Sequence, residues 1–543
     1  MIEAAKRVLR LFQGPVLATL SAVLLALPFC WDALWPVAYF AFLPFFYALR
    51  RKASSQIFRI STLFGLVFFL IESYPVIYVT VVGYLALAST LALYFALFGY
   101  LARPCLLIQA ETGKMYYRGS LKAVCFVPAI WVFLEYARSF LFSGMPWGLL
   151  AYSQGKNLVG IQIADMVGVF GVSFFVMFVN VALFKIQEAY FFDGAPEEVG
   201  FDRRRERRRY LLQLTGALGL GILLVGAYGG ITLALRENVA PQRVLRAAVV
   251  QGNIPQDQKW DTRIKNIIFE KYKRLTFMAA LEKPDLVVWP ETSFPGYLED
   301  EPILAAKLRS LVRHSGTRVL VGAPTLGNLD QGLRFYNSAM LFGADGEERA
   351  RYSKIRLVPF GEFLPFEPLL GFMRRLVPIP HFSPGREKVL FELIGLGQKK
   401  NERAKFAVLI CYEDIFPELV GSFCHNGADF LVNITNDAWF GPTSAPYQHA
   451  QASVFRAVEN RVPVIRAGNT GLSCFISPEG RILSRVQDKG QDIFVTGYKA
   501  QELSLRKTTT LYTRFGHFFF LVPAFLCFLA YQDNAKRHPY SKL

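Results

Sequence analysis

Charged residues and histidines are both scarce in this chain of 543 residues. Asp, Glu, Lys and Arg make up only 19% of it, and six residues are histidine. An ordinary soluble domain carries about 25% charged residues, and a disordered chain combines few apolar residues with a high net charge. The small share of charged residues therefore argues against a soluble domain, and the 53% of hydrophobic residues excludes a disordered chain. The scattered histidines form no motif for a metal ligand set.

Cysteine is also sparse, and its spacing gives no framework. The seven cysteines are an odd number and include no Cys-x-x-Cys pair. A disulfide framework usually has an even number of cysteines and a cysteine zinc site usually has such a pair, so neither is indicated. The cysteines are Cys30, Cys105, Cys125, Cys411, Cys424, Cys474 and Cys527.

Apolar residues, in contrast, are abundant and fall in long runs. Hydrophobic residues make up 53% of the chain and aromatic residues 15%. A helix needs about 20 apolar residues to cross a bilayer. Runs near this length lie at 14–30, 33–49, 58–80, 84–108, 121–140, 158–187, 210–236 and, alone, near 515–531. We therefore expect a polytopic α-helical membrane bundle of about eight spans. About seven would lie in residues 1–236, and one in residues 514–543 with a cytoplasmic tail.

Two of these runs allow another interpretation. The first follows basic residues as a signal peptide would, but no small-residue cleavage site follows it and the next run begins almost at once. We interpret it as a retained span. The run at 58–80 is interrupted by Glu72 and Pro75, which allows a third helix that ends early.

Basic residues predict the orientation of the spans, because they concentrate in cytoplasmic loops. When the predicted spans alternate sides, the basic clusters all fall on one side, and the opposite loops carry only Lys156. Both termini are therefore expected in the cytoplasm, and residues 237–513 on the outer face. The net charge of +18 then reflects topology, and we expect no nucleic-acid partner. The clusters include Lys6, Arg7, Arg10, Arg50, Arg51, Lys52, Arg103, Lys114, Arg118, Lys122, the arginines of 203–209, Lys536, Arg537 and Lys542.

Residues 237–513 have the pattern of an α/β domain. Short β-rich runs alternate there with amphipathic stretches whose apolar residues recur every three or four positions. Such alternation predicts an α/β fold, and about 270 residues can bury a full core. The predicted strands are 244–251, 285–289, 318–323, 336–342, 405–410, 429–434, 462–467 and 473–477, and the predicted helices are 262–282, 302–314 and 446–460.

Three polar residues lie at or after strand ends in this domain, where α/β sheets usually place their chemistry. Glu291 ends DLVVWPE, Cys411 follows KFAVLI, and Lys354 follows the strand predicted at 336–342. A carboxylate, a thiol and an amine suit covalent acyl chemistry, since they supply a base, a nucleophile and an oxyanion stabiliser. Each also has an ordinary explanation: a cysteine in a core, a glutamate that caps a turn, and a solvated lysine.

Four segments raise the weight of the chemical interpretation. They resemble the nitrilase or carbon-nitrogen hydrolase superfamily. The segments are VVWPETSFP (287–295), YSKIRLVPFGEFLPF (352–366), LICYEDIFP (409–417) and NITNDAWFG (433–441). That resemblance implies a Glu-Lys-Cys triad in this chain order and an α/β/β/α sandwich. The predicted spans on both sides of this domain narrow the resemblance to the apolipoprotein N-acyltransferase family, and it then covers nearly the whole chain. Three further segments share it: QGNIPQDQKW (251–260), SGMPWGLLAYSQ (143–154) and 449–471. One departure is Thr470, where many members have a second Asn, and we expect it to alter only a loop contact.

The resemblance implies a reaction in two halves. Cys411 would be the nucleophile, Glu291 the general base and later acid, and Lys354 the stabiliser of the oxyanion. A phospholipid would give its sn-1 chain to Cys411 as a thioester, and the chain would pass to the free α-amine of a diacylglyceryl-cysteine at the N-terminus of an apolipoprotein. This is a ping-pong scheme without metal or organic cofactor. It implies a bacterial inner-membrane enzyme with a periplasmic catalytic domain, and we expect it to act as a monomer.

The resemblance also implies supporting residues. Glu362 and Glu413 would orient the triad, and Tyr412 and Trp260 would lie near it, against the alternatives of structural carboxylates and core aromatics. Asn433, Asn436, Asp437 and Trp439 would shape the floor of the site.

The apolar composition of two loops is explained if the acyl donor comes from a bilayer. The loop 360–384 carries Arg374 and Arg375 and is predicted to be a flap at the membrane surface; a packed Ω-like loop is the alternative. In the loop 144–154, Trp147 and Tyr152 would face either the headgroups or the site, and an interfacial aromatic belt explains them equally well.

Two other functions stay open. A membrane-tethered amidase would use the same triad, with water in place of the amine. A transporter or receptor with an inactive outer domain would need ionisable residues along a path, and the spans offer only Glu72, Glu135 and Asp165.

Overall fold

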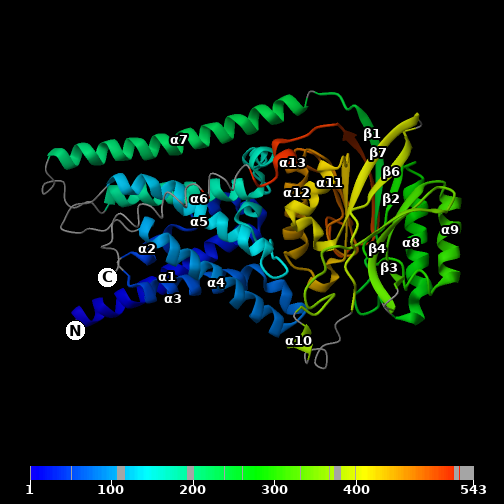
Figure 1. The fold of residues 1–543 in the computed structure, drawn as a ribbon, viewed down its shortest axis with the longest axis horizontal. Coiled ribbons are helices and arrows are strands. Elements are labelled where there is room, and N and C mark those ends of the chain that lie inside the picture. The colour runs from blue at the N-terminus through cyan, green and yellow to red at the C-terminus, as the bar shows by residue number, and fades with distance from the viewer. Residues whose placement is uncertain are drawn as a thin grey trace. The chain divides into compact units, whose positions relative to one another are not determined.

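The computed structural model describes residues 2–50, 52–106, 117–191, 201–237, 239–259, 261–329, 332–365, 367–371, 381–397, 399–518 and 525. The chain divides into two compact units, which Figure 1 colours along the sequence. Unit 1 is Met1–Glu237 with Phe515–Leu543, and unit 2 is Asn238–Arg514. Trp260 and residues 372–380, which include Arg374 and Arg375, lie outside the described residues.

Unit 1 is helical, and its helices coincide with the predicted apolar runs. Among the described residues, seven helical segments are long and apolar enough to cross a membrane. Most of the run near 515–531 lies outside the described residues, so the total of about eight stays a prediction. The long helices are α1 (Ile2–Cys30), α3 (Ser54–Glu72), α4 (Val81–Leu106), α5 (Tyr117–Phe140), α6 (Ala164–Phe191) and α7 (Phe201–Glu237).

The second and third runs are broken by proline. The second consists of the 3-10 helix η1 (Asp32–Tyr39) and the short helix α2 (Leu43–Leu49) instead of one helix. Pro36 lies inside η1 and a second proline begins α2; proline lacks the N–H that a continuous helix needs. In the third run, α3 ends at Glu72 and η2 (Tyr74–Tyr78) follows, which confirms the early end.

Unit 2 contains two six-stranded sheets (Figure 1). The strand orders are β12-β1-β2-β3-β4-β5 and β11-β10-β9-β8-β7-β6. The strands β1, β2 and β3 run parallel, as do β7, β8 and β9, while the flanking pairs are antiparallel. The bounds are β1 (Arg243–Gln251), β2 (Leu286–Val288), β3 (Arg318–Leu329), β4 (Gly332–Phe342), β5 (Glu348–Ser353), β6 (Leu390–Leu396), β7 (Lys399–Ile410), β8 (Phe430–Thr435), β9 (Val464–Gly468), β10 (Cys474–Ile476), β11 (Ile482–Arg485) and β12 (Gly497–Leu505).

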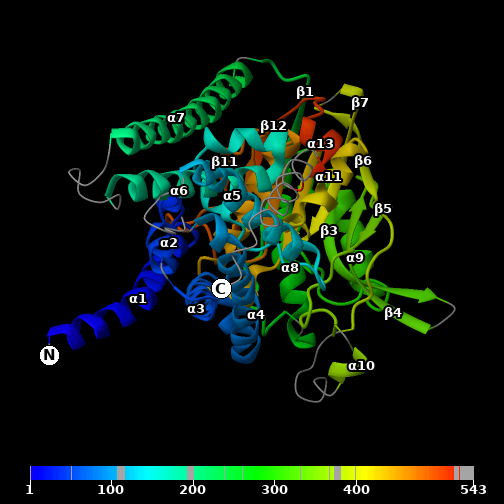
Figure 2. The ribbon, with the colours of Figure 1, turned by 60° about the vertical axis from the view of Figure 1, so that its left-hand side comes forward.

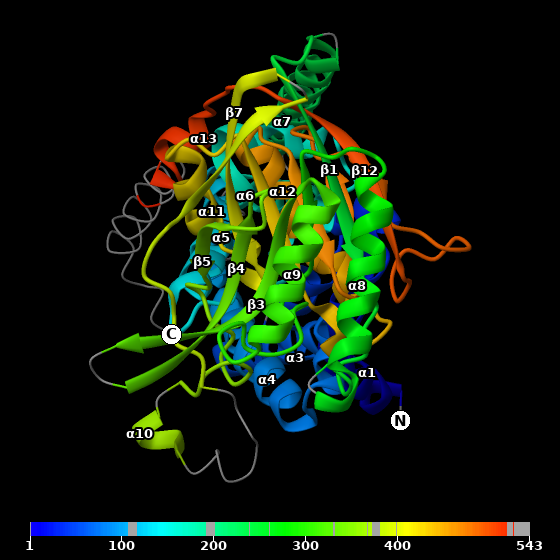
Figure 3. The ribbon, with the colours of Figure 1, turned by 90° about the vertical axis from the view of Figure 1, so that its right-hand side faces the viewer.

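Helices cover the outer face of each sheet, which gives the four layers α/β/β/α that the resemblance implied. Figure 3 shows α8 (Lys265–Ala280) and α9 (Pro302–Ser315) in front of the first sheet. On the second sheet lie α11 (Pro417–His425) and α12 (Ala445–Asn460), with the short α13 (Leu511–Phe515) nearby (Figure 1). Side chains of α8, α9 and β1 to β4 form one buried core, and burial of such side chains is the main source of stability.

The sequence located the central strands and missed several peripheral ones. All eight predicted strands and three predicted helices are present. The missed strands are β5, β6, β11 and β12. Only two of the nine residues of β12, which lies at the sheet edge, are buried, so it lacks a continuous apolar run. The strands β3 and β4 are also longer than predicted, and Figure 2 shows their hairpin extending beyond the rest of the sheet.

Candidate active site

The turn after β2 holds Glu291 in a fixed position. Trp289 is fully buried, stacks on Tyr272 at 4.9 Å, and donates a hydrogen bond to Thr276 Oγ1 at 2.8 Å. A buried tryptophan with its N–H paired is a strong anchor, and Glu291 lies two residues later. The neighbouring strand β3 approaches this turn closely at Gly322, where an added Cβ would lie 2.3 Å from Pro290 O. Glu291 itself is 6% exposed.

Lys354 follows β5 directly and points into a cluster of carboxylates. Its Nζ lies 2.9 Å from Glu362 Oε1 and 3.4 Å from Glu291 Oε1, and the residue is 1% exposed. Burial alone would lower the pKa of the Lys354 amine, but Glu362, Glu291 and Cys411 outweigh it and raise that pKa well above its ordinary value. Lys354 is therefore a permanent cation in this site.

Cys411 follows β7 directly and begins the 3-10 helix η7 (Cys411–Ile415) in a strained conformation. Its φ of +54° is in the left-handed region, which residues with a side chain adopt at a cost. Asn433 Nδ2 donates to Cys411 O at 2.8 Å, which helps to hold this turn. Burial raises the pKa of the Cys411 thiol, and Glu291 raises it further while Lys354 opposes them. The resting group is therefore a thiol, and it needs a base to become a nucleophile.

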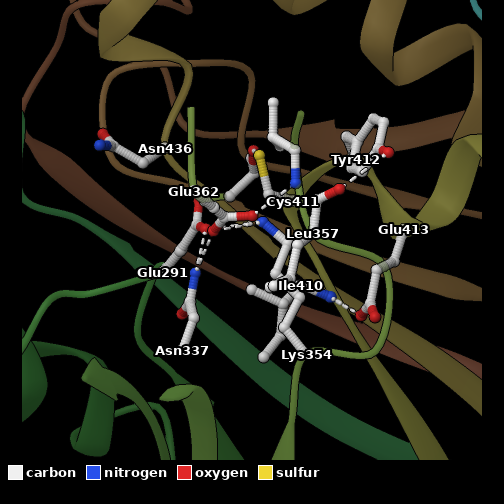
Figure 4. Close-up of polar contacts among 12 residues, drawn as sticks. Glu291, Asn337, Lys354, Leu357, Glu362, Ile410, Cys411, Tyr412, Glu413 and Asn436 are labelled. Atoms are coloured by element: carbon white, nitrogen blue, oxygen red, sulfur yellow. Dashed lines mark hydrogen bonds and ion pairs between the residues drawn. The ribbon is translucent and has the colours of Figure 1, made fainter. Parts of the chain in front are cut away.

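The three residues predicted as a triad lie together. Figure 4 shows the Cys411 side chain next to the cluster of Glu291, Lys354 and Glu362. They come from the ends of strands in both sheets: Glu291 follows β2, Lys354 follows β5, and Cys411 follows β7. Because the carboxyl ends of these strands meet, a base, an ammonium and a thiol share one buried site. Such an arrangement suits acyl transfer through a covalent intermediate.

Glu362 and Glu413, predicted as supporting residues, hold the Lys354 loop. Glu362 Oε2 accepts a hydrogen bond from Val358 N at 2.8 Å. Glu413 Oε1 accepts from Ile355 N at 2.7 Å, from Arg356 N at 3.0 Å and from the Tyr352 hydroxyl at 2.8 Å, and its Oε2 accepts from Ile410 N at 2.8 Å. Burial raises the pKa of Glu413 to about 7 although these donors oppose it. Glu413 thus ties the segment after Lys354 to the turn that carries Cys411.

The other predicted residues are less central in the geometry. Tyr412 is buried, and its hydroxyl donates to Leu357 O at 3.2 Å. Trp147 belongs to unit 1, where its carbonyl accepts a hydrogen bond from Arg138 Nη1 at 2.7 Å. Trp439 is half exposed, and Asn436 donates to Gln256 Oε1 at 2.7 Å.

Sequence reasoning missed two residues of the site. Asn337 Nδ2 donates to Glu291 Oε1 at 2.7 Å and to Glu362 Oε1 at 3.0 Å, so it holds both carboxylates (Figure 4). Lys259 Nζ donates to Glu291 O at 2.9 Å, and burial lowers the pKa of this amine to about 8. An amide inside the strand predicted at 336–342 was the available signal for Asn337. Lys259 lies next to Trp260 in the segment QGNIPQDQKW (251–260), whose resemblance to the family was the available signal for it.

Two family models match the chain, one in each unit. The carbon-nitrogen hydrolase model matches residues 246–504, and the model of the apolipoprotein N-acyltransferase N-terminal domain matches residues 21–182. An apolipoprotein N-acyltransferase of Geobacter metallireducens is 37% identical over 93% of this chain and 92% of its own length. One of Allorhizobium ampelinum is 33% identical over 74% of this chain and 70% of its own length. Among solved structures, an amidase from Nesterenkonia sp. is 20% identical, covers 49% of this chain and 93% of its own length, and has a TM-score of 0.36.

Proposed function

The chain belongs to the apolipoprotein N-acyltransferase family, and from this premise we propose that Cys411 carries a fatty acyl chain from a membrane phospholipid to an apolipoprotein. Family membership favours N-acyl transfer over the amidase that the sequence left open. The single observation that carries the proposal is the buried cluster of Glu291, Lys354 and Glu362 beside Cys411.

In the first half-reaction Glu291 takes the proton from the Cys411 thiol. The sulfur attacks the ester carbonyl of the sn-1 chain, and the negative charge that develops on the carbonyl oxygen is stabilised by the Lys354 ammonium. The C–O bond of the ester then breaks, and the leaving lysophospholipid oxygen receives the proton from Glu291. The products are a thioester on Cys411 and a lysophospholipid.

In the second half-reaction the neutral α-amine of a diacylglyceryl-cysteine attacks the thioester. Glu291 accepts the proton that the amine nitrogen loses, and the C–S bond breaks as the amide forms. The Cys411 sulfur then takes the proton back from Glu291. Because each substrate reacts with the enzyme separately, this scheme predicts ping-pong kinetics.

The remaining carboxylate and amide position these groups. Lys354 contacts both Glu362 and Glu291, and Asn337 donates to the same two carboxylates. Among the charges that raise the pKa of Lys354, that of Glu362 is the largest, so the ammonium keeps its charge when Glu291 is transiently protonated. Glu362 therefore serves as a counter-ion of Lys354 beside Glu291, the base of the proposed reaction.

We also propose the placement that the charge pattern predicts. The chain is a multi-pass membrane protein with seven apolar helical segments among its described residues. Its basic loops would lie in the cytoplasm, and residues 237–513 would form a periplasmic catalytic domain on a bacterial inner membrane. Residues 1–236 would form the N-terminal bundle and residues 514–543 a last span with a cytoplasmic tail.

The proposal is tested by mass spectrometry of the purified full-length chain after incubation with phospholipid alone. We expect a fatty-acyl mass on the Cys411 peptide that hydroxylamine removes, and that a diacylglyceryl-cysteine peptide discharges as an amide. The mass should be absent in Cys411→Ala and unchanged in Cys424→Ala, a buried cysteine of α11. An unmodified Cys411 in the wild-type chain would contradict the proposal.

A further inference from the structure

A second cluster of buried charged residues lies near Cys411 in the second sheet and the helices that pack on it. The proposed reaction does not use this cluster. The cluster consists of Asp414 in η7, Asp437 in the 3-10 helix η8 (Asp437–Phe440), His449 in α12 and Arg466 in β9. Each of these residues is at most 2% exposed. Four ionisable groups with so little solvent must compensate one another, because an isolated buried charge is very costly.

The geometry of His449 fixes its charge. Nδ1 lies 3.0 Å from Asp437 Oδ1, and Nε2 lies 2.9 Å from Asp414 Oδ1. An ionised carboxylate only accepts hydrogen bonds, and a neutral imidazole has only one N–H. A neutral ring would therefore direct a lone pair at one of the two carboxylates. Both contacts are satisfied only when both ring nitrogens carry a proton, so His449 is an imidazolium.

The cluster is balanced when His449 is charged. Arg466 Nη1 lies 3.3 Å from Asp414 Oδ2, and its Nη2 lies 3.1 Å from Asp437 Oδ2. Two cations thus face two carboxylates, and Ser453 Oγ also donates to Asp414 Oδ2. Burial and Arg466 lower the pKa of His449, but the two carboxylates outweigh them and raise it. Burial raises the pKa of Asp437, but His449 and Arg466 outweigh it and lower that pKa to about 2.

Thr435 connects the cluster to the nucleophile. Its Oγ1 lies 3.5 Å from Cys411 Sγ and 3.1 Å from Asp437 Oδ1. The hydroxyl has one hydrogen, so it donates to either the sulfur or the carboxylate. Asp437 also acts on the sulfur directly, because its negative charge raises the pKa of the Cys411 thiol. The state of Asp437 therefore influences the thiolate in two ways.

We infer that His449 is a positioning residue that keeps Asp437 compensated, so that the Thr435 hydroxyl is free to donate to the Cys411 sulfur as its proton leaves. With His449 and Arg466 donating to its two oxygens, Asp437 does not need the Thr435 hydrogen. Without the imidazolium, Thr435 would donate to Asp437, and the uncompensated carboxylate would oppose the thiolate. The inference deepens the proposed function, since it concerns the same nucleophile.

The other charges near the sulfur are the same in every variant of the test. Glu291 and Lys354 act on Cys411 from the first sheet, and Lys259 is also within electrostatic reach. The charges that act most strongly on His449 are those of Arg466, Asp414 and Asp437. A change of His449 or Thr435 therefore reports on the cluster and not on the carboxylates around Lys354.

The test is the pH dependence of Cys411 alkylation by iodoacetamide in the full-length chain, followed by peptide mass spectrometry. The thiolate displaces iodide and forms a C–S bond, so the rate follows the thiolate fraction. For His449→Gln we expect the half-point of the profile to rise by about one pH unit, with about tenfold slower alkylation below it. Thr435→Val should shift the half-point in the same direction, and Thr435→Ser should restore the wild-type profile.

The matched control is His425→Gln, an exposed histidine of the same domain whose ring Nδ1 lies 3.3 Å from Thr513 O. Its profile should coincide with that of the wild type. The inference is overturned if Thr435→Val, a change of one polar group with little change of shape, leaves the half-point unchanged, even if His449→Gln does not fold. Alkylation needs no lipid. Absence of a thioester in the wild type together with shifted alkylation would thus contradict the proposed function and support this inference.

Discussion

Replacement of Gly322 by alanine should test whether the position of the turn that carries Glu291 limits the rate of thioester formation. An added Cβ at Gly322 would lie 2.3 Å from Pro290 O, 2.8 Å from Glu291 Cα and 2.9 Å from Thr292 N. Ordinary van der Waals contact begins at 3.4 Å, so the carbonyl would have to move by about 1 Å. All three atoms belong to the backbone, which cannot swing away as a flexible side chain would.

The expected effect has two parts. Overpacking of this kind costs about 1–3 kcal/mol of stability, and displacement of a catalytic group by about 1 Å costs about 100-fold in rate. The rate of thioester formation on Cys411 should therefore fall by about 100-fold in Gly322→Ala while the protein still folds. The assays are peptide mass spectrometry over a time course and thermal unfolding in detergent.

The control is Gly421→Ala in α11, where an added Cβ would meet only Tyr512 at 3.7 Å. Alanine is favoured in a helix by about 1 kcal/mol, so this variant should be as active as the wild type and at least as stable. If Gly322→Ala formed the thioester at the wild-type rate, the position of the turn that carries Glu291 would not limit the reaction, and the reasoning would fail.

Three further outcomes test other contacts. Lys354→Met should slow thioester formation by at least about 100-fold, because it removes the proposed oxyanion stabiliser and the ion pairs of Glu291 and Glu362. The pKa of Asp437 is lowered to about 2. The contribution of this carboxylate to stability is therefore present above the ordinary pKa near 4 and is lost as pH falls through about 2. Melting temperatures measured from pH 5 to pH 2.5 should fall less steeply in Asp437→Asn than in the wild type. Arg138→Leu should destabilise unit 1 by about 3 kcal/mol, since Arg138 donates to the carbonyls of Trp147 and Gly148 from a buried position; thermal unfolding measures this, and an unchanged melting temperature would contradict it.

The sequence was sufficient for features that depend on local pattern. Apolar runs located the long helices, and short β-branched runs located the parallel strands at the centre of each sheet. Glu291 and Cys411 were singled out because each follows a strand that the apolar pattern predicted. Lys354 follows β5, which the pattern missed, and its segment 352–366 was singled out by its resemblance to the nitrilase superfamily. The break at Pro36 and the edge strand β12 were missed, since an apolar run does not show a kink and an exposed strand has no apolar run.

Contacts between distant segments were not accessible in the same way. Asn337 and Glu291 are 46 residues apart, and His449 and Asp414 are 35 residues apart. Each appears unremarkable in its own segment, because an amide in a strand or a histidine in a helix is usually structural. Only the pairing of β2, β3 and β4, and the packing of α12 on the second sheet, brings these side chains to their partners.

The balance of charge explains why a thiol with a raised pKa can still serve as the nucleophile in the proposed reaction. The proposed base Glu291 and its neighbours Glu362, Lys354 and Lys259 form a group of two carboxylates and two amines. When Glu291 takes the proton of Cys411, one negative charge moves from oxygen to sulfur and the net charge does not change. A buried site resists the creation of net charge far more than its relocation. The same reasoning requires the acceptor amine to enter as the neutral base, because an ammonium would add an uncompensated charge; the rate of discharge of the thioester should therefore rise with pH until the amine of the acceptor is fully deprotonated.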